Sequence, residues 1–96
     1  MSEREIEELL SVVRGLILEV MEEDEAEVTV ALETLFQDDL ELESIELIAL
    51  GDLLLARYGD SLDFAGWLTQ LSLDELAELK VGDLVSWLHR ELSEQR

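Results

Sequence analysis

Residues 36–47 hold the side chains whose types and spacing point most directly to chemistry. The stretch places one hydroxyl, that of Ser44, at the start of a segment whose apolar residues repeat with helical spacing. Ser44 either caps this helix by accepting a free backbone N–H, or stands exposed as an attachment point where amide dipoles favour a phosphate ester. Both interpretations can hold in part, but capping alone requires no particular flanks, so the surrounding acidic and apolar residues need a further explanation. These flanking residues are Asp38, Asp39, Glu41, Leu42, Glu43, Ile45 and Glu46.

Other candidates for catalysis or metal binding are weak. The one histidine, His89, is near the end of the last expected helix, and no glycine-flanked nucleophile pattern is present. A hydrolase would need His89 beside Ser44. With no cysteine and one histidine the usual zinc ligand sets are missing. The acidic run at residues 22–25 lacks the glycine and spacing of a calcium loop, which indicates a solvated charge run.

Length and charge limit the function further. The chain has 96 residues, which suits a single domain over residues 1–96, and 48% of them are hydrophobic, enough for a modest core. Twenty-five Asp and Glu against six Lys and Arg give a formal charge of −19, which disfavours nucleic acid and anionic membranes and favours basic partners. No signal peptide or long apolar run is evident, so we expect a cytoplasmic monomer.

Apolar periodicity predicts an all-α fold around this serine. We expect a first helix over residues 3–21, opened by a capping box at Ser2, and then a long connection over residues 26–43. A second long helix follows over residues 44–57, with Gly59 just past its end. Helical spacing continues over residues 64–71, a second capping box at Ser72 opens a short helix to Leu79, and residues 81–92 form the last helix.

The inward faces of these helices are predicted from the same spacing. In the first helix they are Ile6, Leu9, Leu10, Val13, Leu16, Ile17 and Val20; in the second, Leu47, Leu50, Gly51, Leu54 and Tyr58; in the third segment, Phe64, Trp67, Leu68 and Leu71. In the short helix Leu73, Leu76 and Leu79 share one side, and in the last helix the inward residues are Val81, Leu84, Val85, Leu88 and Leu92. For Phe64 and Trp67 we expect core packing rather than a ligand pocket.

One motif resembles a known family. Ahead of an apolar helix that closes at Tyr58-Gly59, the chain carries Phe36-x-x-Asp39-Leu40-x-x-Glu43-Ser44-Ile45. This pattern resembles the acyl carrier protein family, whose members carry Phe-x-x-Asp-Leu-Gly-x-Asp-Ser-Leu. Further along, Leu79-Lys-Val-Gly-Asp-Leu-Val85 is similar to the opening of the family's final helix. The resemblance covers nearly the whole chain.

The resemblance implies a fold and a function. The fold would be an acyl-carrier-like four-helix bundle, with a long loop between its first two helices and an extra short helical segment before the last. A phosphopantetheinyl transferase that uses coenzyme A and magnesium would attach 4′-phosphopantetheine to Ser44, and the thiol of this arm would hold acyl intermediates as thioesters. The domain would catalyse nothing itself. Its further partners would be an acyltransferase or acyl-activating ligase and a ketosynthase or other synthase enzyme.

The resemblance also implies a partner surface around Ser44, formed by Glu43, Ile45, Glu46, Leu47, Ile48 and Asp52. The chain departs from the family pattern at three positions. Members have glycine in place of Glu41 and aspartate in place of Glu43, and a capping threonine is usual in place of Lys80. Ala49, Leu55 and Ala56 occupy positions that tend to be acidic in fatty-acid carriers. Together with the longer segment at residues 62–71, these differences favour polyketide or related secondary-metabolite biosynthesis over general fatty-acid synthesis.

Two alternatives stay open. Ser61, within Asp-Ser-Leu-Asp at residues 60–63, matches the literal motif of many carriers better than Ser44 does, but it has neither the lead-in nor the long helix, so we expect a turn or cap there. The other function class is a non-carrier acidic helical module that binds a basic partner protein through its charge, with Ser44 only a cap.

Overall fold

In the computed structural model, residues 3–24, 28–59 and 62–94 are described, and they form five α-helices. The helices are α1 (Glu3–Met21), α2 (Ser44–Tyr58), α3 (Phe64–Thr69), α4 (Leu73–Ala77) and α5 (Val81–Glu94). Those three ranges contain no strand, and their only β-type pairing is an isolated bridge between Leu35 and Lys80. The prediction of an all-α fold is therefore confirmed.

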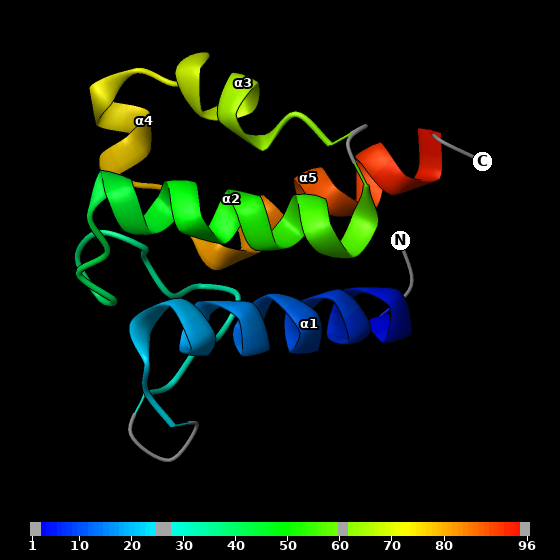
Figure 1. Ribbon diagram of the computed structural model, residues 1–96, viewed down its shortest axis with the longest axis horizontal. Helices are drawn as coiled ribbons and strands as arrows, with labels where there is room; N and C mark the ends of the chain where they lie inside the picture. Colours follow the sequence, from blue (N-terminus) through cyan, green and yellow to red (C-terminus); the bar gives the residue numbers. More distant parts are fainter. Residues whose placement is uncertain (1–2, 25–27, 60–61, 95–96) are drawn as a thin grey trace.

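Three long helices form the body of the molecule. α1 packs against both α2 and α5, and α3 packs against α2. Figure 1 shows α3 and α4 on the side of α2 that faces away from α1, with α5 behind α2. The molecule measures 35 × 29 × 22 Å along its principal axes. α1 is thus one wall of the fold, and the two short helices lie at the opposite wall.

The apolar spacing places the predicted faces inward. In α1, Val13 and Ile17 are fully buried and the other five predicted residues are partly buried against the core. In α2, Leu50 and Leu54 have no exposed surface, and Tyr58 is half-buried. The buried residues of α5 are Val81, Leu84, Val85, Trp87 and Leu88. The predicted bounds of α1 are confirmed, and α2 and α5 end one and two residues later than expected.

The long connection between α1 and α2 is held against the start of α5 by backbone hydrogen bonds. The N–H of Gly82 donates to the carbonyl of Leu32 at 2.7 Å, the N–H of Val81 donates to Thr34 at 2.9 Å, and Phe36 donates to Leu79 at 3.0 Å. The first two bonds satisfy N–H groups in the first turn of α5, which have no partner inside the helix. The connection is therefore a fixed part of the fold, and it leads directly to α2.

α3 ends at Thr69, two residues before the end of the predicted segment, and α4 differs from its predicted form in two ways. The capping box of α4 is confirmed, because Glu75 N–H donates to the Ser72 hydroxyl and Ser72 N–H donates to the Glu75 carboxylate, both at 3.1 Å. However, α4 ends at Ala77 rather than Leu79, and Leu73 is 85% exposed although it was expected to share a side with buried Leu79. A helix of five residues completes little more than one turn, so it cannot place all three leucines against the same core. The capping box expected at Ser2 lies outside the described residues.

Among the described helices, none is long and apolar enough to cross a membrane.

Candidate functional site

Ser44 is the first residue of α2, and its side chain is exposed. The N-cap is Glu43, one residue earlier, whose backbone N–H donates to a carboxylate oxygen of Glu46 at 3.0 Å. Within the described part of the chain, the Ser44 hydroxyl makes no hydrogen bond. Ser44 is therefore not the cap of α2. Its hydroxyl faces solvent, and its modification would break no hydrogen bond of the fold.

The loop before Ser44 is fixed by the residues of the sequence motif. Phe36, Leu40 and Leu42 are buried, with at most 6% of their surface exposed. A carboxylate oxygen of Asp39 accepts the backbone N–H of Leu35 at 2.8 Å, and Leu42 N–H donates to the Phe36 carbonyl at 3.0 Å. The three apolar anchors and these two bonds close the loop, and they leave Ser44 outside it.

Glu41 lies in this loop with a φ of 53°. This is the left-handed region, which glycine adopts without a steric penalty and which other L-residues adopt at a cost. Glu41 occupies the position at which the acyl carrier family, which the motif resembles, has glycine. The backbone conformation that a glycine would favour is thus present here with a glutamate.

An open groove lies beside Ser44, with a volume of about 590 Å³. Its apolar lining comes from the loop, from α2 and from α4, which faces Ser44 across the groove. These residues are Phe36, Leu42, Leu47, Leu73, Leu76 and Ala77. Ligand pockets in proteins typically have volumes of about 300–1,000 Å³ and mostly apolar walls. The groove is therefore large enough to take an apolar chain that begins at the Ser44 hydroxyl.

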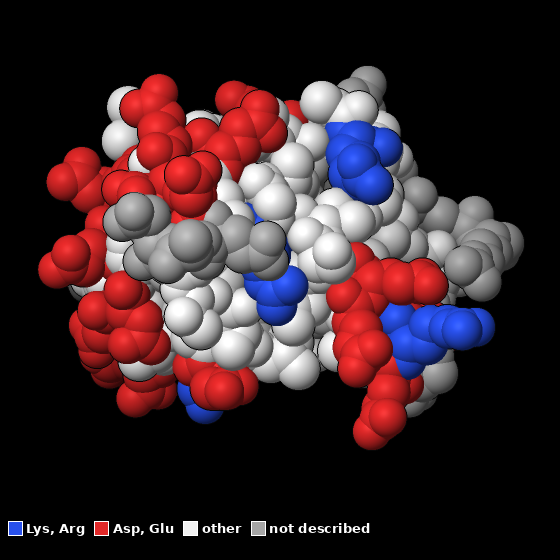
Figure 2. Space-filling model, turned by 90° about the horizontal axis from the view of Figure 1, so that it is seen from below, with Lys and Arg blue, Asp and Glu red and all other residues white. Residues whose placement is uncertain are grey.

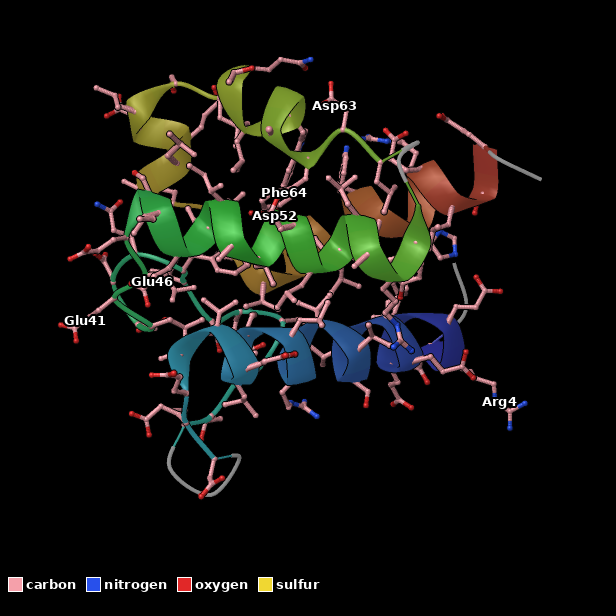
Figure 3. All side chains as sticks on the ribbon, in the orientation of Figure 1. Arg4, Glu41, Glu46, Asp52, Asp63 and Phe64 are labelled. Carbon is pink, nitrogen blue, oxygen red and sulfur yellow. The ribbon has the colours of Figure 1, made fainter. Side chains whose placement is uncertain are left out.

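The predicted partner surface divides into exposed and packed residues. Ile45 is 70% exposed and Ile48 is 59% exposed, and Asp52 continues the same stripe of α2 at the next helical step. Glu43 is exposed as well, whereas Glu46 is half-buried and Leu47 packs against the core. Figure 3 shows Glu41 and Glu46 at the end of α2 that carries Ser44, and Asp52 near the middle of the helix. Leu47 thus lines the groove rather than the outer surface.

The end of the molecule that carries this site is acidic. In Figure 2 acidic side chains cover one end of the face, where α1 stops and α2 begins, and a smaller acidic group lies near the other end beside a basic side chain. Exposed carboxylates at the end where α1 stops and α2 begins include Glu22, Glu23, Glu41 and Glu43. These charges repel a free anion, so a phosphate group at Ser44 would have to be held covalently.

The helix start nevertheless offers donors to such a group. Among the described hydrogen bonds, none is donated by the backbone N–H of Ser44 or Ile45, as is usual in a first helical turn. A phosphate ester on the Ser44 hydroxyl would lie beside these two N–H groups and the positive end of the helix dipole. The local backbone therefore fits a phosphoserine-type linkage.

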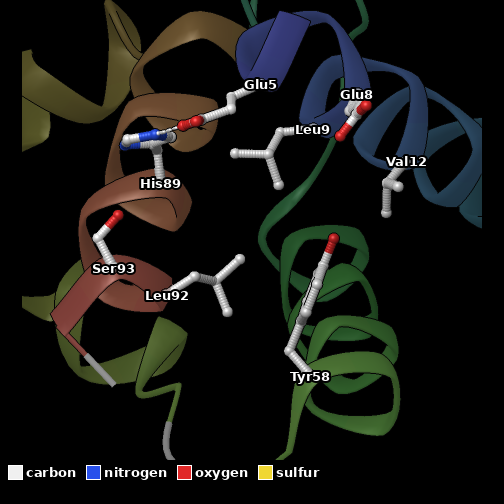
Figure 4. Close-up of a pocket in the computed structure, with 8 residues that line it drawn as sticks. All are labelled: Glu5, Glu8, Leu9, Val12, Tyr58, His89, Leu92 and Ser93. Carbon is white, nitrogen blue, oxygen red and sulfur yellow. Dashed lines mark hydrogen bonds and ion pairs between the residues drawn. The ribbon is translucent and has the colours of Figure 1, made fainter. Parts of the chain in front are cut away.

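His89 lies far from Ser44. Its ring pairs with the Glu5 carboxylate of α1, and both residues line a cleft with Tyr58 (Figure 4). Tyr58 is the last residue of α2 and Ser44 the first, and a helix rises 1.5 Å per residue, so this cleft is roughly 20 Å from the serine. The structure thus gives Ser44 no imidazole base.

The structure adds a feature that the sequence analysis missed. The sequence indicated Ser44 and its flanks, but not that α4 would form the facing wall of a groove. The sequence carried no clear signal for this groove, because the apolar spacing of Leu73, Leu76 and Leu79 does not show that the helix ends at Ala77 and leaves Leu73 exposed. No group of three or more His, Cys, Asp or Glu side chains in the described ranges could hold a metal ion. Ser61, the competing serine, lies outside the described residues.

No protein-family model, curated protein sequence or solved structure matches this chain.

Proposed function

We propose that this chain is an acyl carrier domain that bears a 4′-phosphopantetheine arm on the Ser44 hydroxyl. The observation that carries the proposal is the hydroxyl itself, which is exposed at the first position of α2 and free of structural hydrogen bonds within the described residues. When bound, the arm supplies a thiol that holds acyl groups as thioesters. In this proposal the domain catalyses no reaction, and Ser44 is a point of attachment.

The groove beside Ser44 supports the proposal. An acyl chain on the arm carries apolar surface, and apolar surface is stabilised when it is removed from water. Leu47, Leu73 and Leu76 offer such a surface within the groove next to the attachment point. The four-helix arrangement of the carrier family would correspond to α1, α2, α4 and α5, with α3 as the additional short segment.

Tethering explains what such a domain contributes to a pathway. A substrate on a flexible arm reaches a partner's active site at the effective concentration set by the tether, which is about millimolar for short linkers. The partners would be the modifying transferase, an acyltransferase or acyl-activating ligase, and a ketosynthase or other synthase enzyme. Exposed Ile45 and Ile48 beside Asp52 give a mixed apolar and acidic contact surface. This mixture favours a polyketide or related specialised pathway, in the cytoplasm where coenzyme A is supplied.

The test is covalent loading followed by intact-mass measurement. The protein is incubated with a broad-specificity phosphopantetheinyl transferase, coenzyme A and magnesium, and we expect the mass of one arm to be added. Ser44→Ala should abolish the addition completely, whereas Ser61→Ala should retain it. Because Ser44 is not the N-cap, Ser44→Ala should change the free energy of unfolding by less than about 0.5 kcal/mol, so lost loading would not reflect unfolding.

Three results would count against the proposal. They are no addition to the unaltered chain, an addition that survives Ser44→Ala, and an addition that Ser61→Ala removes. The first would favour the acidic interaction module that binds a basic partner, and the last would move the attachment point to Ser61.

A further inference from the structure

A cluster of three aromatic rings joins α3 to α5. The rings of Trp67 and Trp87 are stacked, with centroids 5.0 Å apart and planes 13° apart, and Phe64 lies 5.9 Å from each of them. Phe64 and Trp87 are almost fully buried, at 3% and 4% exposure, whereas Trp67 is only half-buried. Figure 3 places Phe64 between α3 and the body of the molecule. Trp87 is therefore held in the core, and Trp67, which stacks against it, is partly exposed at the surface.

The half-buried tryptophan lines an open groove with a volume of about 380 Å³. Trp67, Leu71 and Trp87 supply its apolar and aromatic lining, and Glu75, Glu78 and Asp83 supply its carboxylates. We call this the tryptophan groove. Among the described residues that line it, Arg90 is the one cation, so this lining has an excess of negative charge around an aromatic surface.

The helix α4 separates this groove from the one at Ser44. Leu73, Leu76 and Ala77 line the Ser44 groove, while Glu75 and Glu78, on the same five-residue turn and its end, line the tryptophan groove. The lining residues of the two grooves do not overlap. A partner could therefore occupy the tryptophan groove and leave Ser44 accessible.

The carboxylates of the tryptophan groove have capacity for a cation. Glu75 accepts one backbone N–H, from Ser72, and Asp83 accepts one, from Lys80, so each carboxylate keeps acceptor sites that these bonds do not use. Glu78, the C-cap just after α4, makes no side-chain hydrogen bond or ion pair within the described residues. Lysine or arginine side chains are the groups that these carboxylates would pair with most strongly.

We propose that the tryptophan groove docks a basic segment of a partner protein, with one large apolar side chain against Trp67 and Leu71 and with lysine or arginine side chains on Glu75, Glu78 and Asp83. Charge complementarity argues for this occupant, because a groove with three carboxylates and one guanidinium repels an acidic segment. Aromatic residues in well-packed positions are also the ones that dominate interface energies. The inference does not depend on the modification of Ser44.

The chain carries its own reporter for this site. It has two tryptophans, Trp67 and Trp87, and both line the tryptophan groove. The probe is a short synthetic amphipathic peptide of lysine and leucine, titrated into the full chain while tryptophan emission is recorded. We expect a saturable shift in emission, and no comparable shift with an acidic peptide in which glutamate replaces lysine.

Matched variants separate a docking site from general attraction to an acidic protein. Glu75→Gln, Glu78→Gln and Asp83→Asn together should weaken peptide binding by about tenfold, because rim charges contribute modestly each. The amides keep the acceptors that cap α4 and α5, and Glu78→Gln alone, which removes no structural bond, should give part of the loss. The control variant, with Glu19→Gln, Glu22→Gln and Glu23→Gln, loses the same charge from α1 and its end and should bind within about twofold of the unaltered chain.

Two results would overturn the inference. They are the absence of a saturable tryptophan signal, and an equal loss of binding in the control variant. Ser44→Ala should leave peptide binding unchanged, so a failed loading experiment and a failed docking experiment remain distinguishable.

Discussion

At the scale of single residues, Glu41 is a departure from the acyl carrier motif that the structure explains in part, because its backbone conformation is unusual. Its φ of 53° puts Cβ in a region where L-residues are strained by about 1–2 kcal/mol. The loop keeps this conformation because Phe36, Leu40 and Leu42 are buried around it and Asp39 closes the preceding turn. The strain at Glu41 is therefore imposed by its neighbours.

Relief of this strain should stabilise the protein. Glu41→Gly removes the Cβ but also makes the unfolded chain more flexible, at a cost of roughly 0.5–1 kcal/mol, so we expect a net gain of about 0.5 kcal/mol in the free energy of unfolding. Glu41→Ala is the matched control, because it removes the same charge and keeps the Cβ. Urea denaturation measures the free energy of unfolding of both variants. If the alanine variant were as stable as the glycine variant, charge removal and not backbone strain would explain the gain.

At the scale of elements, the fold depends on the contact between the long connection and the start of α5. Gly82 allows this contact, because a Cβ at this position would lie 2.8 Å from the carbonyl oxygen of Leu32, which is a backbone atom. The Gly82 N–H donates to that same oxygen at 2.7 Å. A side chain would push the two segments apart and lengthen a bond that satisfies the helix start.

Substitution of Gly82 should therefore destabilise the protein. We expect Gly82→Ala to lower the free energy of unfolding by roughly 1–3 kcal/mol, the usual cost of inserting an atom into a closely packed contact. Gly15, in the middle of α1, is the matched control, because apart from its chain neighbours and the backbone of its own helix no atom lies within 4 Å of the place that a Cβ would take there. Gly15→Ala should raise the free energy of unfolding by about 0.5–1 kcal/mol, because alanine favours the helix. If Gly82→Ala left the free energy of unfolding unchanged, the connection would have to shift at this point without cost.

The elements also show what could be predicted from the sequence. The spacing of Val13 and Ile17 and the capping box at Ser72 are local signals, and the helices they predicted are present. The attachment of the connection to α5 was not predictable, because backbone hydrogen bonds between segments far apart in the chain leave no pattern in side-chain type. The exposure of Leu73 was missed for a related reason, since apolar spacing cannot show that a helix ends after five residues.

The candidate site, too, was predictable from the sequence only in part. Ser44 and its exposed apolar neighbours Ile45 and Ile48 were found from the motif and the helical pattern. The two grooves were not, because each is formed by residues from different helices, and α4 takes part in both. Trp67 was expected in the core, and it is half-buried there and lines a groove as well.

At the scale of the whole molecule, charge is the dominant property. A formal charge of −19 is carried on a body of 35 × 29 × 22 Å. The Debye length is about 30 Å at 0.01 M salt and about 8 Å at 0.15 M. At low salt every carboxylate therefore repels charges across the whole molecule, whereas at physiological salt it repels only its near neighbours. Folding brings these charges together, so their mutual repulsion opposes the folded state.

We therefore expect sodium chloride to stabilise the protein. If screening between about 0.01 and 0.15 M recovers about 1 kcal/mol, the melting temperature should rise by roughly 4–8 °C for a chain of this size. Thermal denaturation followed by circular dichroism measures the change. The variant with Glu19→Gln, Glu22→Gln and Glu23→Gln should show a smaller rise, because it begins with three fewer negative charges at the acidic end. A melting temperature that is independent of salt, or that falls as salt is added, would show that ion pairs outweigh the repulsion.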